Sequence, residues 1–177
     1  AQLPLLEIID PALTNSLIRS LILKGQQGGW LPIFPCWNSY TAAMIGDHVA
    51  AFIAGAWNKG LRDYNVQAAY TLIRRNAFES PDQYADYKNG MGRRALASYI
   101  RFGYIPMEDS VQEAFHKKEQ VSRTLEYAYD DYAVSLMAQG LRKQADYTAL
   151  RKRSFNYKNV FDPEVGMMRG RHETGRF

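Results

Sequence analysis

The sequence predicts an all-α protein, and three observations support this prediction. Apolar residues recur at helical spacing through most of the chain, and glycines follow several of these periodic segments. Asp10-Pro11 and Ser80-Pro81 each place a capping side chain before a proline, which is typical of a helix start. No stretch shows the alternation of a half-buried strand. The succession of helix pairs, undivided by any linker, fits an α/α toroid or a segment of one.

The first third of the chain predicts two helices separated by an aromatic loop. One helix begins at Asp10 and ends in the glycine-rich residues 25–29. Residues 29–37, GWLPIFPCW, contain too many prolines for a helix and are too irregular for a strand, so we expect an ordered loop there. A second helix is predicted over residues 39–59. Its residues are small and apolar on nearly all sides, which indicates a buried helix.

The remaining chain predicts further helices joined by long loops. The predicted helices lie at residues 64–75, after Ser80-Pro81, at 91–102, at 121–141 and at 145–157. Ser110 and Glu113 have the spacing of a capping box, and residues 161–166, FDPEVG, turn the chain out of the last helix. Loops as long as these usually carry function.

The helix predicted over residues 121–141 organises the rest of the chain. Its main apolar stripe consists of Leu125, Tyr129, Tyr132 and Leu136, and its carboxylates are Glu126, Asp130 and Asp131. A helix with so many acids and tyrosines either holds polar partners inside a core or faces a cavity. These two alternatives imply different functions for the protein.

Composition excludes several classes of partner. The 177 residues suffice for one domain or for part of a larger one, and the formal net charge is +4. Lys and Arg form no basic run interleaved with aromatics, so we expect no nucleic-acid partner. No apolar run approaches the roughly 20 residues of a membrane helix, and no signal peptide is expected in the first residues. Localisation is not readable from these features.

Two carboxylates in the helix at 121–141 have two possible roles. Glu126 and Asp130 are four residues apart and therefore share one helix face, with Asp131 adjacent. Such a pair fits the general acid and base of a glycoside hydrolase. Alternatively, acids near a helix start interact with the helix dipole and pair with arginine, and Arg123 is placed to do so.

Other candidate chemistry is limited. Asp47 and His48 lie within an apolar segment, either as a pair facing a ligand or as a buried pair whose hydrogen bonds are satisfied. The histidines lack the spacing of a zinc site, and residues 90–94, GMGRR, lack the preceding strand of a phosphate loop. Cys36 has no activating neighbour, so we expect it to pack. The aromatic loop around Trp37 suits the apolar face of a sugar ring as well as the edge of a core.

Three long motifs carry a resemblance to a known family. They are GGWLPIFPCWNSYTAAMIGDHVAAFIAGAWNKGL at residues 28–61, VSRTLEYAYDDYAVSLMAQGL at 121–141 and RSFNYKNVFDPEVGMMRGR at 153–171. In this order they closely resemble glycoside hydrolase family 92, whose members are calcium-dependent, inverting, exo-acting α-mannosidases, many of them α-1,2-specific. The resemblance extends from about Leu3 to the end of the chain.

The resemblance implies that this chain is one helical segment, residues 1–177, of a larger catalytic domain. The family's catalytic (α/α)6 toroid follows a β-sandwich domain, so the chain is expected to be incomplete at both ends. The family's Trp-Asp-Thr, Thr-Glu-Gly-Asn-Ala-Trp and Gly-Asn-Asp-Asp motifs do not occur here. The catalytic pair is therefore expected outside these residues, as are the calcium ligands, and the chain alone is expected to be inactive. The resemblance also implies an α-mannoside or mannose-containing glycan as substrate and a secreted or periplasmic location.

Six residues are predicted to face the cavity of such a toroid, in supporting or substrate-binding roles. They are Trp37, Asp47, His48, Glu126, Asp130 and Asp131. One departure is Gly55, where most relatives are expected to carry aspartate; its loss leaves either a gap or a closer approach of helices. Two other functions remain open, namely a different inverting toroid glycosidase such as a trehalase-like hydrolase, and a non-catalytic helical binding or scaffold module.

Overall fold

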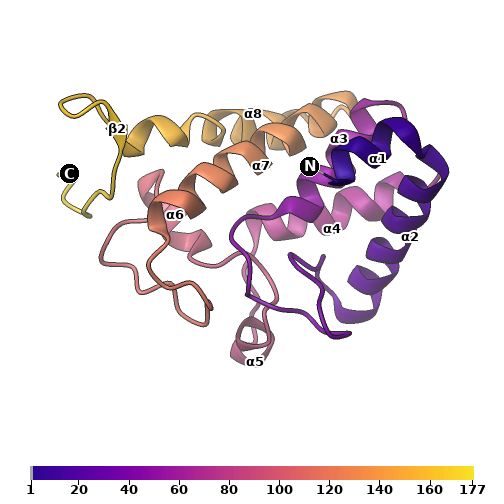
Figure 1. Ribbon diagram of the computed structural model, residues 1–177, viewed down its shortest axis with the longest axis horizontal. Helices are drawn as coiled ribbons and strands as arrows, with labels where there is room; N and C mark the ends of the chain where they lie inside the picture. The colour runs from indigo at the N-terminus through magenta and orange to yellow at the C-terminus, as the bar shows by residue number, and fades with distance from the viewer. Residues whose placement is uncertain (1) are drawn as a thin grey trace.

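The computed structural model describes residues 2–177 and confirms the all-α fold (Figure 1). Its α-helices are α1 (Gln2–Ile9), α2 (Pro11–Gly28), α3 (His48–Asn58), α4 (Val66–Phe78), α5 (Tyr84–Lys88), α6 (Leu96–Phe102), α7 (Gln120–Gly140) and α8 (Gln144–Arg153). The 3-10 helix η1 (Asn156–Val160) leads into β1 (Phe161–Asp162), which pairs antiparallel with β2 (Met167–Met168). Long loops connect the helices on the lower side of Figure 1.

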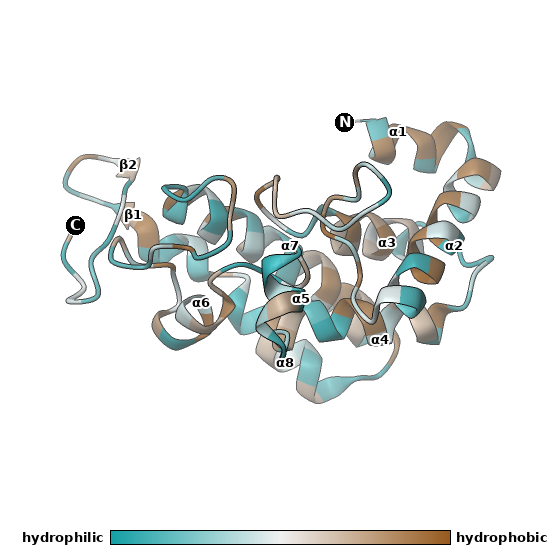
Figure 2. Cartoon of the chain, turned by 90° about the horizontal axis from the view of Figure 1, so that it is seen from below, coloured by the Kyte–Doolittle hydropathy of each residue, from teal (hydrophilic) through white to brown (hydrophobic). Residues whose placement is uncertain are grey.

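The main apolar core gathers around α3 and α7. Helix α7 packs against α8 and α3, while α1 contacts both α2 and α3, and α2 also contacts α4. Helix α3 is hydrophobic along most of its length (Figure 2), and Ala50, Ile53 and Ala54 are fully buried. Their small or compact side chains allow the surrounding helices to pack closely. A smaller core joins α6 to α7 through Tyr99 and Tyr127.

Several predicted elements are confirmed. Asp10 caps α2, since its Oδ1 accepts a hydrogen bond from the N–H of Leu13 at 2.9 Å. The helix ends at Gly29, which has the left-handed φ of 81° that favours glycine. The helix predicted at residues 121–141 is α7, displaced by one residue, and those predicted at 64–75 and 145–157 correspond to α4 and α8.

The helix predicted over residues 39–59 begins much later than expected, at His48. Residues 39–47, nine of the 21 predicted, instead belong to the preceding loop. Gly46 has a left-handed φ of 89°, which ends any helix at that point. The hydroxyls of Tyr40 and Thr41 donate to the carbonyls of Trp30 and Phe34, at 2.6 and 2.7 Å, and hold the loop closed. The residues in each of these contacts are seven or ten positions apart in the sequence, so hydrophobic periodicity does not predict the contacts.

Other boundaries also differ from prediction. The helix expected at 91–102 begins at Leu96, because Gly92 and Ala95 have left-handed φ values of 71° and 53°. No helix begins at the expected capping box, where Val111 and Glu113 have positive φ. Sequence reasoning missed α1 and the two short strands, and α5 begins at Tyr84 rather than directly after Ser80-Pro81.

The stripe of Leu125, Tyr129, Tyr132 and Leu136 is not the buried face of α7. Tyr129 and Tyr132 are 57% and 42% exposed. The helix instead buries the face that carries Tyr127, Asp130 and Asp131, because their polar groups find partners inside the chain. Within residues 2–177, no helix has the length and apolar character needed to cross a membrane.

The contact between α3 and α7 gives a testable prediction. A Cβ on Gly140 would overlap the six-membered ring of Trp57, which is 8% exposed and enclosed by the core. We expect Gly140→Ala to lower the free energy of unfolding by roughly 1–3 kcal/mol, despite the better helix propensity of alanine. Urea denaturation of the full-length protein measures the loss. The exposed neighbour Gln139 provides the control, since Gln139→Ala should be nearly neutral; equal midpoints for both variants would contradict the close contact.

Candidate functional site

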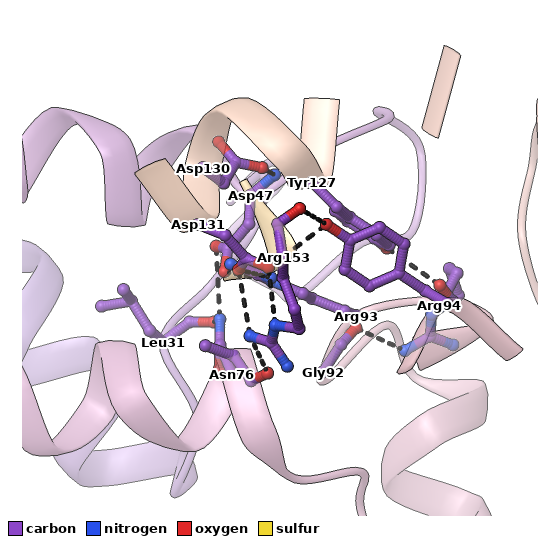
Figure 3. A network of polar contacts seen from close by, with 12 residues as sticks. Leu31, Asp47, Asn76, Gly92, Arg93, Arg94, Tyr127, Asp130, Asp131 and Arg153 are labelled. Carbon is purple, nitrogen blue, oxygen red and sulfur yellow. Dashed lines mark hydrogen bonds and ion pairs between the residues drawn. The ribbon is translucent and has the colours of Figure 1, made fainter. Parts of the chain in front are cut away.

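The centre of the candidate site is the buried side chain of Arg93, in the loop before α6 (Figure 3). Its Nε donates to Oδ2 of Asp47 at 2.9 Å, and its Nη1 donates to Oδ1 of Asp131 at 2.7 Å. All three side chains are 0% exposed. Arg93 therefore joins the start of α3 to the middle of α7.

Asp131 is shared with a second arginine. Arg153 Nε lies 2.8 Å from Oδ2 of Asp131, and the Tyr99 hydroxyl donates to the same oxygen at 3.2 Å. Arg153 also donates to the carbonyl of Ala77 at 2.9 Å, so this one side chain connects α8 with α4 and α7. Although Arg153 belongs to the basic run Arg151-Lys152-Arg153, its side chain is only 11% exposed.

Arg93 remains charged in this environment. Burial disfavours a guanidinium cation, but the carboxylates of Asp131 and Asp47 outweigh that effect and hold the pKa of Arg93 well above its ordinary value. The guanidinium also lies 5.0 Å from the centroid of the Tyr127 ring, which adds a cation–π interaction. Removal of the Arg93 guanidinium, or of the carboxylates that pair with it, would leave the remaining charge buried and unpaired, which is strongly unfavourable.

Asp130 differs from its two acidic neighbours because it has no cation of its own. Its Oδ2 accepts a hydrogen bond from the backbone N–H of Asp47 at 2.7 Å, while Oδ1 is buried without a hydrogen-bond partner. Burial raises the pKa of Asp130 well above its ordinary value, although Arg93 acts in the opposite direction. A neutral Asp130 leaves two carboxylates, Asp47 and Asp131, to balance two guanidinium groups, Arg93 and Arg153.

His48 and Glu126 lie at the edge of this network, where the molecule opens to solvent. His48 is the first residue of α3, and its Nδ1 lies 3.8 Å from Oε2 of Glu126 on α7. Their side chains are 48% and 40% exposed. His48 lines a cavity of about 490 Å³ between α1, α3 and α7, together with Tyr129. The two side chains can therefore donate hydrogen bonds to a polar ligand and accept hydrogen bonds from it.

Glu7 of α1 lies beside Gly55 of α3, and both residues line this cavity. A Cβ on Gly55 would lie 3.3 and 3.4 Å from the two carboxylate oxygens of Glu7. Sequence reasoning left open a gap or a closer helix approach at Gly55. The structure shows a carboxylate from α1 there instead, paired with Lys59.

Trp37 lies away from these residues. It is 87% exposed and has a left-handed φ of 50°. It lines a separate hollow formed by the loop before α3, the C-terminal end of α5 and the loop before α7. Its neighbours there include Thr41, Lys88 and Phe115.

The six predicted residues thus fall into three groups. Asp47, Asp130 and Asp131 meet in one buried network, His48 and Glu126 lie together near the cavity, and Trp37 is apart. The six residues do not line one cavity of this chain, because the three aspartates are 0% exposed. Asp47 and Asp131 pair with Arg93 and Arg153, and Asp130 accepts a hydrogen bond from a backbone N–H. The substrate-binding role of the six residues stays a prediction.

Sequence reasoning missed Arg93, Arg153, Glu7 and Lys59. The available signal for Arg93 was the pair of acids expected inside apolar helices, since buried carboxylates need a cation. Arg123 was expected to pair with Glu126, but it is buried and donates to the carbonyl of His116 at 3.3 Å. Spacing along one helix does not reveal partners that come from distant loops.

The described residues do not fit a calcium site. Among residues 2–177, no three His, Cys, Asp or Glu side chains gather in a way that could hold a metal ion. Asp47, Asp130 and Asp131 lie together, but two guanidinium groups lie among them and repel a divalent cation.

The arginine network gives a prediction of stability. We expect Arg93→Met to lower the free energy of unfolding by roughly 3–5 kcal/mol, because it leaves Asp47 and Asp131 buried without their shared cation. The matched control is Arg19→Met, which removes an exposed ion pair with Asp63 and should cost less than about 1 kcal/mol. Thermal and urea unfolding of the full-length protein measure both. Similar small losses in the two variants would contradict a stabilising role for the network.

The environment of Asp130 gives a prediction of pH dependence. Since the folded-state pKa is raised, the folded protein binds a proton more tightly than the unfolded chain. Asp130 therefore costs no stability below its unfolded pKa of about 4, and it destabilises progressively as pH rises toward its folded pKa. Asp130→Asn keeps an acceptor for the Asp47 N–H and removes this titration. We expect the difference in melting temperature, variant minus wild type, to increase with pH; a difference independent of pH would contradict a raised pKa.

Comparison with known proteins places this geometry in a family. The whole chain, residues 1–177, matches the family model described as glycosyl hydrolase family 92 catalytic domain. An uncharacterized secreted glycosidase of Arthroderma benhamiae is 30% identical over 152 residues, which is 83% of this chain and 19% of that protein.

Solved structures agree with this assignment. The family GH92 alpha-mannosidase BT3965 from Bacteroides thetaiotaomicron, including its complex with mannoimidazole, matches 99% of this chain and 21% of its own, with a TM-score of 0.83 and 28% identity. The family GH92 inverting mannosidase BT2199 from the same organism matches 99% and 22%, with a TM-score of 0.85 and 24% identity, and supports the fold alone. The chain spans about a fifth of the length of these relatives. It belongs to glycosyl hydrolase family 92 and forms part of an (α/α)6 toroid.

Proposed function

We propose that the full-length protein that contains this chain is an exo-acting α-mannosidase. The observation that carries the proposal is the match of the entire chain to the family, together with its likeness to an alpha-mannosidase in complex with mannoimidazole. In this proposal the substrate is a glycan with terminal, α-1,2-linked mannose, and the protein is secreted, as the fungal relative is described to be.

This chain supplies a wall of the active site in the proposed enzyme. The inverting mechanism requires a general acid and a general base roughly 6.5–9.5 Å apart, with a water between base and sugar. Asp47 and Asp131 do not suit either role, because arginine pairs bury their carboxylates and exclude substrate. Since the family's acid and base motifs do not occur in this sequence, we expect the acid and base in other parts of the full-length protein. His48 and Glu126, which are exposed, suit hydrogen bonds to substrate hydroxyls.

Calcium and the remaining domains are further parts of the proposal. A calcium ion requires six to eight oxygen ligands, and the buried carboxylates of Asp47 and Asp131 are engaged with arginine, so we expect its ligands elsewhere in the protein. The partners of this chain would be the remainder of the toroid and a β-sandwich domain. Exposed apolar residues on α1, including Leu5, Ile8 and Ile9, suit such intramolecular packing.

The proposal predicts a difference between the full-length protein and the chain alone. The full-length protein should release mannose from α-1,2-mannobiose, and EGTA should abolish the release. Residues 1–177 alone should release none, because the acid and base are absent. Early NMR spectra should show β-mannose first, as inversion of an α-linkage requires.

Substrate and product controls make the experiment decisive. Trehalose and the α-1,3- and α-1,6-linked mannobioses serve as comparison substrates. Hydrolysis of trehalose alone would establish a different toroid glycosidase, and α-mannose as the first product would contradict inversion. Mannose release by the isolated chain would show that these residues contain a complete site.

A further inference from the structure

The cavity between α1, α3 and α7 has the form of a small-molecule site. Its volume is about 490 Å³, within the range of ligand pockets. Polar groups line two sides of it, and Phe52 and Tyr129 provide aromatic surface. Figure 1 shows α1 lying close to α3, with which it is in contact. Tyr129 of α7 also lines the cavity, so residues distant in sequence surround one space.

The buried carboxylate of Glu7 is the most informative group in the cavity. Its side chain is 2% exposed, and Oε2 lies 2.5 Å from Nζ of Lys59, whose side chain is 45% exposed. Burial of a carboxylate is costly in free energy. The ammonium group of Lys59 uses only part of the capacity of this carboxylate to accept hydrogen bonds. Glu7 therefore has capacity left for a ligand on the cavity side.

Charge balance identifies the class of ligand. The carboxylate of Glu7 and the ammonium of Lys59 cancel, so this part of the cavity favours neither an anion nor a cation. It does favour hydroxyl groups, each of which both donates and accepts hydrogen bonds. The exposed ring of Tyr129 suits the apolar face of a sugar.

Gly55 provides the room for such a ligand. It lies within α3 at an ordinary helical φ, so the backbone does not require glycine there. Any side chain at this position would enter the cavity beside the Glu7 oxygens, at 3.3–3.4 Å. The absence of a side chain at Gly55 thus leaves the cavity open beside the Glu7 oxygens.

We propose that this cavity binds one neutral pyranose unit of the glycan. Glu7 accepts hydrogen bonds from adjacent sugar hydroxyls, Lys59 holds the carboxylate and donates to one of them, and Gly55 leaves space for the ring. This inference rests on the proposed glycosidase function, and its test distinguishes the two.

Gly55→Ala in the full-length protein is the first test. Alanine improves helix propensity and places a methyl group in the cavity, so we expect an unchanged or higher melting temperature. At the same time KM for the mannoside should rise about tenfold, the effect of losing roughly one ligand hydrogen bond of about 1.4 kcal/mol. A purely structural Gly55 would change stability without changing KM.

Glu7→Gln is the second variant, and Glu164→Gln is its matched control on an exposed turn. Glutamine keeps the size of the side chain but removes the charge that attracts hydroxyl donors. We expect KM to rise about tenfold or more in Glu7→Gln and to stay at the wild-type value in Glu164→Gln. Wild-type KM in both Gly55→Ala and Glu7→Gln would overturn the cavity proposal and leave the mannosidase proposal intact.

If the full-length protein hydrolyses no mannoside, the proposed function is overturned. Calorimetric titration of the full-length protein with mannose, glucose and methyl α-mannoside then tests the cavity alone. Binding to wild type that Gly55→Ala and Glu7→Gln weaken supports the cavity. Absence of binding, binding unchanged in both variants, or a crystal structure of the full-length protein with other side chains filling the space would overturn it.

Discussion

The buried interaction of Arg93 with Asp47 and Asp131 is the constraint on which the rest of the structure depends. One guanidinium connects the start of α3 to the centre of α7, and Arg153 extends the connection to α8. Charges at 0% exposure persist only when their partners are correctly placed. The helices around them are therefore held in one arrangement, which a purely apolar contact would specify less strictly.

The buried network is connected to the cavity through the backbone at the start of α3. Asp130 accepts from the N–H of Asp47, so the residue immediately before α3 is held by a side chain of α7. His48 follows directly and begins the helix, with its side chain near Glu126. A buried ionic network thus positions exposed groups that suit ligand binding. Such separation of supporting and contacting residues is common where a site must be precise.

Much of the fold could be predicted, but less of the site. Helical period and capping signals located α2 and α7 because those signals are local. They failed at Ser39, where a loop held by distant hydroxyl–carbonyl contacts replaces the expected helix. For the site, sequence patterns identified the acids of α7 but not Arg93. The pairing of Arg93 with α7 depends on tertiary structure, and no local pattern predicts which arginine of a loop contacts a helix.

By itself, the sequence determined the helical class, the main helices and the family, since these follow from periodicity and from long motifs in order. Only the tertiary structure decided which face of α7 is buried and how its acids are used. The sequence left open whether Asp130 and Asp131 face a cavity or are paired inside the core, and the positions of two arginines showed that they are buried. The physical reason is that the protonation state and accessibility of a carboxylate depend on charges and burial contributed by distant parts of the chain.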